Sequence, residues 1–394
     1  MPLDLESLSA QIAEMTQGLS LDASSDRLQA ARAQFVRQDA ANVRARLDDP
    51  KARPAWLVGY PVEPLTNRYP LPPHGDSFCV VAADGSAINP DRHSPVRYYV
   101  INSGYAILSY GAHPDAELGS QCKLFYADED VYVSPKYQTL PIDGALVAVK
   151  MAVSEMEILL LAVEAATEPE VIALRDGTLI LWGLDSPGLS EDVRNRFLGP
   201  YLEAMEALRE RRAPVASYIS FPGSDEVVNA LRVGMCPDDP VVCARCTTLH
   251  DMGVAACAPI VPLEDRRLFT TWLEDGERTG LWMSRQPVVR KFYPHPAQQI
   301  LFFYVNVGGE IGRVEVPQWV ADDAALLNRV HALVVDQCRR GRGFPPALVE
   351  AHEQAVINTG DRQLVERLLE EALAQQQIVL TRSLKDRSKR ERSI

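Results

Sequence analysis

The pattern of an aspartate, a glycine and a hydroxyl residue occurs twice, each time after an apolar run, at residues 84–86 and 176–178. A carboxylate where a buried strand ends in a tight turn lies at a sheet edge, where open α/β sheets build sites. Asp84 and Asp176 on adjacent strands would repel each other unless a cation lay between them. Hard cations such as Mg²⁺ and Mn²⁺ prefer oxygen ligands and support phosphoryl chemistry by activating water. The repetition therefore predicts a divalent metal site, whereas a single Asp-Gly would indicate a plain β-turn.

A glutamate between the two aspartates is a third candidate ligand. Glu157 shares a helical face with Val153 and Leu160, so it points inward if that face packs on the sheet. An acid on a core-facing stripe is costly unless it is paired or bound to metal. This reasoning favours Glu157, while Glu155 and Glu164 fit ordinary solvated acids.

His352 is the candidate histidine among the seven in the chain, since the others show no ligand spacing to one another. Pro346 suits the first turn of a helix whose buried stripe contains Leu348 and Ala351. Beside that stripe, His352 fits either a core histidine or a ligand or proton donor near neutral pH.

A second motif is formed by four of the seven cysteines, which crowd together with His250: Cys236, Cys243, Cys246 and Cys257. They include one C-x-x-C pair but no second close pair, so a zinc or iron–sulfur site and unpaired loop thiols are both open.

The elements expected to position these residues alternate between strand and helix, which indicates a mixed α/β sheet. Strands are expected at 78–83, stopping at Asp84, and at 97–110, 123–126, 170–174, 178–182, 214–220, 300–307 and 311–316. Helices are expected within 1–50 and at 145–166, 190–212, 321–339, 346–358 and 362–376. These divide the chain into a helical segment with a proline-rich connector (1–74), a main domain (75–376) with an inserted cysteine-containing loop (about 236–262), and a basic tail (377–394).

Overall charge limits the class of nucleic-acid protein. The 394 residues carry a net charge of −13, which is the wrong sign for passive coating of nucleic acid. A nuclease stays compatible, because clustered carboxylates bind cations and a local basic channel can hold the substrate. The basic tail fits a DNA contact or a solvated tail, and Arg175 and Arg313 are the other candidate DNA contacts. No export signal and no run of bilayer-spanning length are evident, so we expect a soluble cytoplasmic protein.

Taken in order, these pieces resemble the NurA family of DNA-end-processing nucleases over roughly residues 75–375. The resemblance lies in Asp84 after a strand, a glutamate helix, then Asp176 after a second strand. It continues in the late hairpin, with Arg313 to Pro317 on its second strand, and in a helix carrying Ala-His at His352.

The resemblance implies a ribonuclease-H-like mixed sheet flanked by helices and a homodimer that acts with a hexameric HerA-type ATPase. It implies Mn²⁺-dependent (or Mg²⁺-dependent) cleavage of single- and double-stranded DNA ends in double-strand break repair, as a 5′-to-3′ exonuclease and a single-strand endonuclease. Carried over by position, Asp84, Asp176 and His352 would be metal ligands and catalytic residues. The family glutamate best matches Glu157, with Glu155 as the alternative.

One position departs from the family. A tyrosine eight residues before the histidine is replaced by Phe344, so the role of its hydroxyl is vacant or filled elsewhere, with Tyr304 as a candidate. This departure favours a rival hypothesis, a non-catalytic dimeric adaptor that docks on the ATPase. A metal phosphatase acting on small phosphate esters is a further alternative.

Overall fold

The computed structural model describes residues 4–17, 21–91, 94, 96–133, 139–186, 188–246, 249 and 252–376. The expected basic tail and His250 therefore lie outside the described residues. None of the described helices has the length and apolarity needed to cross a lipid bilayer.

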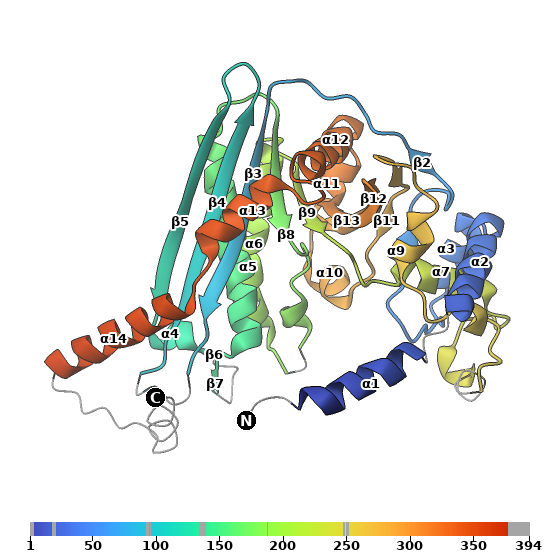
Figure 1. The fold of residues 1–394 in the computed structure, drawn as a ribbon, viewed down its shortest axis with the longest axis horizontal. Helices are drawn as coiled ribbons and strands as arrows, with labels where there is room; N and C mark the ends of the chain where they lie inside the picture. The colour runs from blue at the N-terminus through green and yellow to red at the C-terminus, as the bar shows by residue number, and fades with distance from the viewer. Residues whose placement is uncertain are drawn as a thin grey trace.

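An eleven-stranded mixed sheet with helices on both faces organises the chain (Figure 1). Its main path runs β1-β11-β12-β13-β9-β8-β3-β4-β5, and β10 and β2 branch from β12. The strands are β1 (Tyr60–Pro61), β2 (Arg68–Tyr69), β3 (Phe78–Ile88), β4 (Tyr99–Tyr110), β5 (Asp115–Phe125), β8 (Val171–Asp176), β9 (Val215–Ile219), β10 (Arg278–Thr279), β11 (Trp282–Met283), β12 (Ile300–Val307) and β13 (Glu310–Pro317). A separate pair contains β6 (Tyr132–Val133) and β7 (Leu140–Pro141).

The expected helices are confirmed with small shifts at their ends. The longer ones are α1 (Leu5–Gln17), α2 (Leu21–Arg37), α3 (Ala40–Asp48), α5 (Gly144–Ala165), α6 (Glu191–Glu210), α7 (Glu226–Met235), α12 (Ala324–Arg340), α13 (Pro346–Ala355) and α14 (Thr359–Gln375). Shorter ones are α4 (Asp128–Val131), η1 (Trp182–Asp185), η2 (Cys243–Cys246), η3 (Ala258–Ile260), α9 (Asp265–Thr270), α10 (Pro287–Phe292), η4 (Pro296–Gln298) and α11 (Gln318–Ala321).

The central strands are parallel, and their connections explain why. β8 pairs in parallel with both β3 and β9. Parallel neighbours need a long crossover connection, and α5 precedes β8 while α6 links β8 to β9.

Successive residues of β3 face two different cores. Cys79, Val81 and Ala83 pack with α5 and α6, whereas Val80 and Ala82 pack with α12 and α13. Because side chains alternate along a strand, Asp84 is directed to the α12–α13 side and residue 85 to the α5 side. A third core, formed around α2, α3, α7 and α9, covers part of β11, β12 and β13.

Two expectations about the strands are wrong. β3 does not stop at Asp84 but continues to Ile88, because every residue from 78 to 88 has a partner on β4. Residues 178–182 form no strand, since Gly177 takes a φ of +79° and turns the chain into η1. The connector also joins the sheet, through β1 and β2.

Candidate active site

Asp84 and Asp176 lie on neighbouring parallel strands. Ala83 is paired with Arg175, so the two aspartates follow at the same level of the sheet. The residue Asp176 is exposed, but its carboxyl is partly desolvated, and this burial together with the charge of Asp84 raises its pKa. The Gly177 N–H donates a hydrogen bond to Asp176 Oδ1 at 2.8 Å, and this bond lowers the pKa of Asp176. The two carboxylates are therefore close enough to repel, and a cation between them would remove that cost.

His352 completes this group from a segment far along the chain. Its Nδ1 lies 2.7 Å from Asp84 Oδ2, and the imidazole in its protonated form lowers the pKa of Asp176. The His352 side chain is 61% exposed and that of Asp84 17% exposed. The core-histidine interpretation is therefore wrong, and the imidazole is open to solvent beside two carboxylates.

A glycine on β4 allows α13 to approach closely enough to deliver His352. Gly104 is the β4 partner of Asp84, and a Cβ placed there would overlap the carbonyl oxygen of Ala351 and lie 2.5 Å from the amide nitrogen of Ala355. Asn102 Nδ2 fixes the end of the same helix by donating to the carbonyls of Gln354 at 3.0 Å and Ala355 at 2.9 Å. The helix thus rests directly on the β4 backbone.

Gly104→Ala should lower the free energy of unfolding by about 1–3 kcal/mol, because α13 has to move away from β4 to admit the methyl group. Gly144→Ala is the matched control. At the first turn of α5 a Cβ meets no atom closer than 3.7 Å, so that variant should equal the wild type or exceed its stability by up to about 1 kcal/mol. Urea unfolding of both proteins measures the difference. Equal stabilities would show that the contact between α13 and β4 is not tight.

The expected inward position of Glu157 is wrong. Glu157 is exposed, and its charge acts on Lys150. The buried glutamate of α5 is Glu155, which is 3% exposed. Its Oε1 comes within 2.5 Å of a Cβ built on Gly85, so the glycine next to Asp84 leaves room for this carboxyl. Glu155 therefore lies behind Asp84, on the α5 side of the sheet.

Glu155 is neutralised by an arginine on the neighbouring strand. Arg175 Nε and Nη2 lie 2.7 and 2.6 Å from Glu155 Oε2, and Arg175 also donates to the Thr178 carbonyl. Burial raises the pKa of Glu155, and the charges of Asp84 and Asp176 add to that effect, while Arg175 opposes it. The pair joins α5 to the end of β8, directly before Asp176.

Buried charges on β13 hold the turn after Asp176, which the sequence analysis missed. Glu315 Oε2 accepts hydrogen bonds from Thr178 Oγ1 at 2.6 Å and from the Leu179 N–H at 2.9 Å. Arg313 lies 2.9 Å from Glu315 and 2.6 Å from Glu226. Arg313 and Glu315, at alternate positions among the buried residues of β13, were the available signal.

These positions overturn two expected DNA contacts. Arg175 is 8% exposed and Arg313 is 3% exposed, and carboxylates neutralise both. Neither guanidinium can reach a phosphate, so the expectation that they contact DNA is wrong.

The suggested replacement for the missing phenol is also wrong. Tyr304 is fully buried in the α7–α9 core, where its hydroxyl lies 2.7 Å from both Asp265 and Ser224. Phe344 packs edge-on against Tyr218, with ring centroids 5.7 Å apart. The ring of Phe344 is therefore retained for packing near the site, without a hydroxyl.

The donor set at Asp84 and Asp176 fits a hard divalent cation. No three His, Cys, Asp or Glu side chains among the described residues lie close enough to enclose an ion. Mg²⁺ sites commonly use one or two carboxylates and take their other ligands from water and substrate phosphates, which suits this open pair. The same finding gives no support to a zinc or iron–sulfur site at Cys236, Cys243, Cys246 and Cys257.

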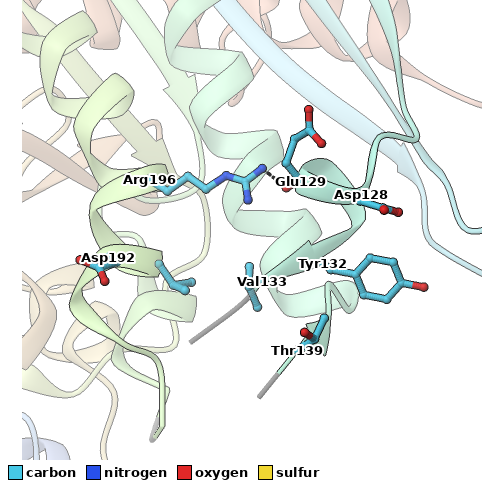
Figure 2. Close-up of a pocket in the computed structure, with 8 residues that line it drawn as sticks. Asp128, Glu129, Tyr132, Val133, Thr139, Asp192 and Arg196 are labelled. Carbon is cyan, nitrogen blue, oxygen red and sulfur yellow. Dashed lines mark hydrogen bonds between the residues drawn. The ribbon is translucent and has the colours of Figure 1, made fainter. Parts of the chain in front are cut away.

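A cavity of about 610 Å³ lies elsewhere, between α4 and α6. Figure 2 shows Asp128 and Glu129 on one side and Asp192 and Arg196 on the other. Arg196 donates to the carbonyl of Glu129. None of the lining residues belongs to the group around Asp84, so this cavity is not the candidate active site.

Comparisons with known proteins give one family. A family model described as NurA domain matches residues 79–357, while no curated protein matches the chain. Solved structures similar to the chain include a crystal structure of NurA with manganese, which is 12% identical, with 77% of this chain and 91% of that chain covered and a TM-score of 0.41. Another is NurA bound to dAMP and manganese, which is 15% identical, with 77% and 90% covered and a TM-score of 0.37. The family model spans most of the chain.

Proposed function

The chain belongs to the NurA domain family, and on that premise we propose that it is a divalent-metal-dependent deoxyribonuclease. The observation that carries the proposal is the meeting of Asp84, Asp176 and His352 at one place on the sheet. The carboxylate pair is chemically suited to Mn²⁺ or Mg²⁺.

Asp84 and Asp176 would hold Mn²⁺ or Mg²⁺, with His352 beside them. When bound, the ion would activate the attacking water and stabilise charge on the leaving oxygen. Glu155 keeps Arg175 in place behind the pair, so it acts as a positioning residue.

His352 has a defined proton-transfer direction. The Asp84 carboxylate accepts from Nδ1, so this nitrogen carries the proton and Nε2 of the neutral ring carries a lone pair. No hydrogen-bond partner of Nε2 is found within the described part of the chain. An exposed imidazole held in this way takes a proton from water and later returns it to the leaving oxygen.

The more detailed features of the proposed function are those implied by the family resemblance. They are a ribonuclease-H-like sheet, a homodimer, a HerA-type ATPase partner, and action on DNA ends in double-strand break repair. The proposed cleavage is 5′-to-3′ exonucleolytic on ends and endonucleolytic on single strands.

Removing the metal should abolish cleavage. With Mn²⁺, the full chain should degrade end-labelled linear and single-stranded DNA, and excess EDTA should reduce the rate to background until Mn²⁺ is restored. A gel time course measures this. Cleavage that persists in EDTA would contradict the metal requirement.

Phe344 favours a second candidate, the non-catalytic adaptor of an ATPase. The same assay separates the two, because an adaptor leaves all DNA substrates intact with Mn²⁺, with Mg²⁺ and in the presence of the ATPase. A chromogenic phosphate ester included in the assay identifies a phosphatase if the ester, rather than DNA, is hydrolysed.

A further inference from the structure

A basic trough lies between the α3–β1 connection and α10. Two cavities of about 510 and 400 Å³ adjoin there, and Arg285 and Arg290 line both. The first also contains Tyr60 and Lys291, and the second contains residues of the connector. We propose that this trough binds the phosphate backbone of a single DNA strand outside the cleavage centre, an inference that rests on the proposed nuclease function.

Positive charge in the trough is incompletely neutralised. Arg285 is half-buried, donates to the Leu47 carbonyl at 3.1 Å and lies 3.8 Å from Asp48. Burial and then the nearby charge of Arg290 lower the pKa of Arg285. Arg290 and Lys291 are exposed, and neither has an ion-pair partner among the described residues. Two arginines that repel each other are stabilised by an anion between them.

The trough is positively charged, whereas the protein as a whole is negatively charged. The chain carries a net charge of −13, so a polyanion is repelled except where cations gather. Asp48 and Asp185 are the acids that line the trough, against Arg285, Arg290 and Lys291. A phosphate chain is the ligand class that matches repeated guanidinium and ammonium groups.

The trough is joined directly to the segment that follows Asp176. Tyr293, one of its lining residues, donates its hydroxyl to the Leu179 carbonyl at 2.9 Å. Asp185, at the end of η1, lines the second cavity. Between them, Trp182 is 49% exposed, and an exposed aromatic ring is a surface on which an unpaired base stacks. Residues 177–185 therefore connect Asp176 along the chain to the trough, which they reach at Asp185.

Binding of a single strand to the full-length chain in EDTA tests the trough without cleavage. The variant Arg290→Gln/Lys291→Gln removes the two exposed cations, and Arg37→Gln/Lys123→Gln removes two exposed cations elsewhere. Fluorescence anisotropy with a labelled 20-nucleotide oligomer is measured over a salt series. We expect the dissociation constant of the trough variant to rise about tenfold and its slope of log K against log salt to fall by about 1.4, since each single-strand phosphate contact contributes about 0.7. The control should match the wild type in slope.

Each remaining outcome decides the proposal. An unchanged affinity and slope in the trough variant would overturn it, as would equal competition by free dAMP or inorganic phosphate, which would show a site for one phosphate only. Cleavage with Mn²⁺ is measured in parallel. If the wild-type protein does not cleave DNA but its binding depends on the trough residues, the trough is supported and the nuclease assignment is defeated. If the protein cleaves DNA but its binding does not depend on those residues, the nuclease assignment is supported and the trough is defeated.

Discussion

Asp84→Asn should leave a folded protein that cleaves DNA about a thousandfold more slowly than the wild type, a loss of about 4 kcal/mol of transition-state stabilisation. One oxygen of Asp84 lies 2.7 Å from His352 Nδ1, and Asp84 lies on the strand next to the one that carries Asp176. The neutral amide removes a charged ligand for the ion and weakens the orientation of the imidazole. Both effects act on the reacting groups rather than on the core.

Although Asp84→Asn should lose activity, its stability should not decrease. The charge of Asp84 contributes to the raised pKa of Asp176, so its removal lets that pKa fall and removes a repulsion at pH 7. The free energy of unfolding should therefore equal or exceed that of the wild type. Single-turnover cleavage with Mn²⁺, urea unfolding and Mn²⁺ binding followed by electron paramagnetic resonance measure the three effects.

Glu157→Gln is the matched control, because it also removes one carboxylate but at an exposed position of α5. It should cleave at the wild-type rate. If Glu157→Gln lost as much activity as Asp84→Asn, or if Asp84→Asn kept full activity, the assignment of the site would be wrong.

The carboxylate pair could be predicted from sequence because its signal is local. Each aspartate follows a short apolar run, and such runs mark buried strands. The two aspartates were expected on adjacent strands. The register in which Ala83 faces Arg175 bears out that expectation.

Local sequence does not decide whether Glu155 or Glu157 points inward. α5 has buried residues around most of its circumference, including Val153, Met156 and Leu159, so its sequence does not single out one face. The inward position of Glu155 depends on Gly85 and Arg175, which lie on two strands that the helix spacing does not specify.

Contacts between distant segments account for the other differences. β3 continues through Asp84 because β4 pairs with it over its whole length, although the Asp-Gly pattern is typical of a turn. His352 reaches Asp84 only because Gly104 lets α13 rest on β4. Such close approaches depend on the packed arrangement of the sheet and are invisible to local periodicity.

Arg175→Met should lower the free energy of unfolding by about 3–5 kcal/mol, because it leaves the Glu155 carboxylate buried without a partner. Glu155 is 3% exposed and Arg175 8% exposed, so water cannot replace the lost guanidinium. Burial and the charges of Asp84 and Asp176 already raise the pKa of Glu155. Without Arg175 that pKa rises further, and stability should decline as the pH increases through it.

A double-mutant cycle in urea measures the pair. Glu155→Leu/Arg175→Met removes both charges and should recover most of the stability, since apolar replacement of a buried pair is often neutral. The control is the exposed pair of Arg211 and Glu164, whose side chains are 42% and 38% exposed; Arg211→Met should cost less than about 1 kcal/mol. A loss in Arg175→Met no larger than this would mean that Glu155 is not buried beside Asp84. Because Arg175 directly precedes Asp176, the double variant should also show whether the pair positions that carboxylate, through slower cleavage in a protein of near-normal stability.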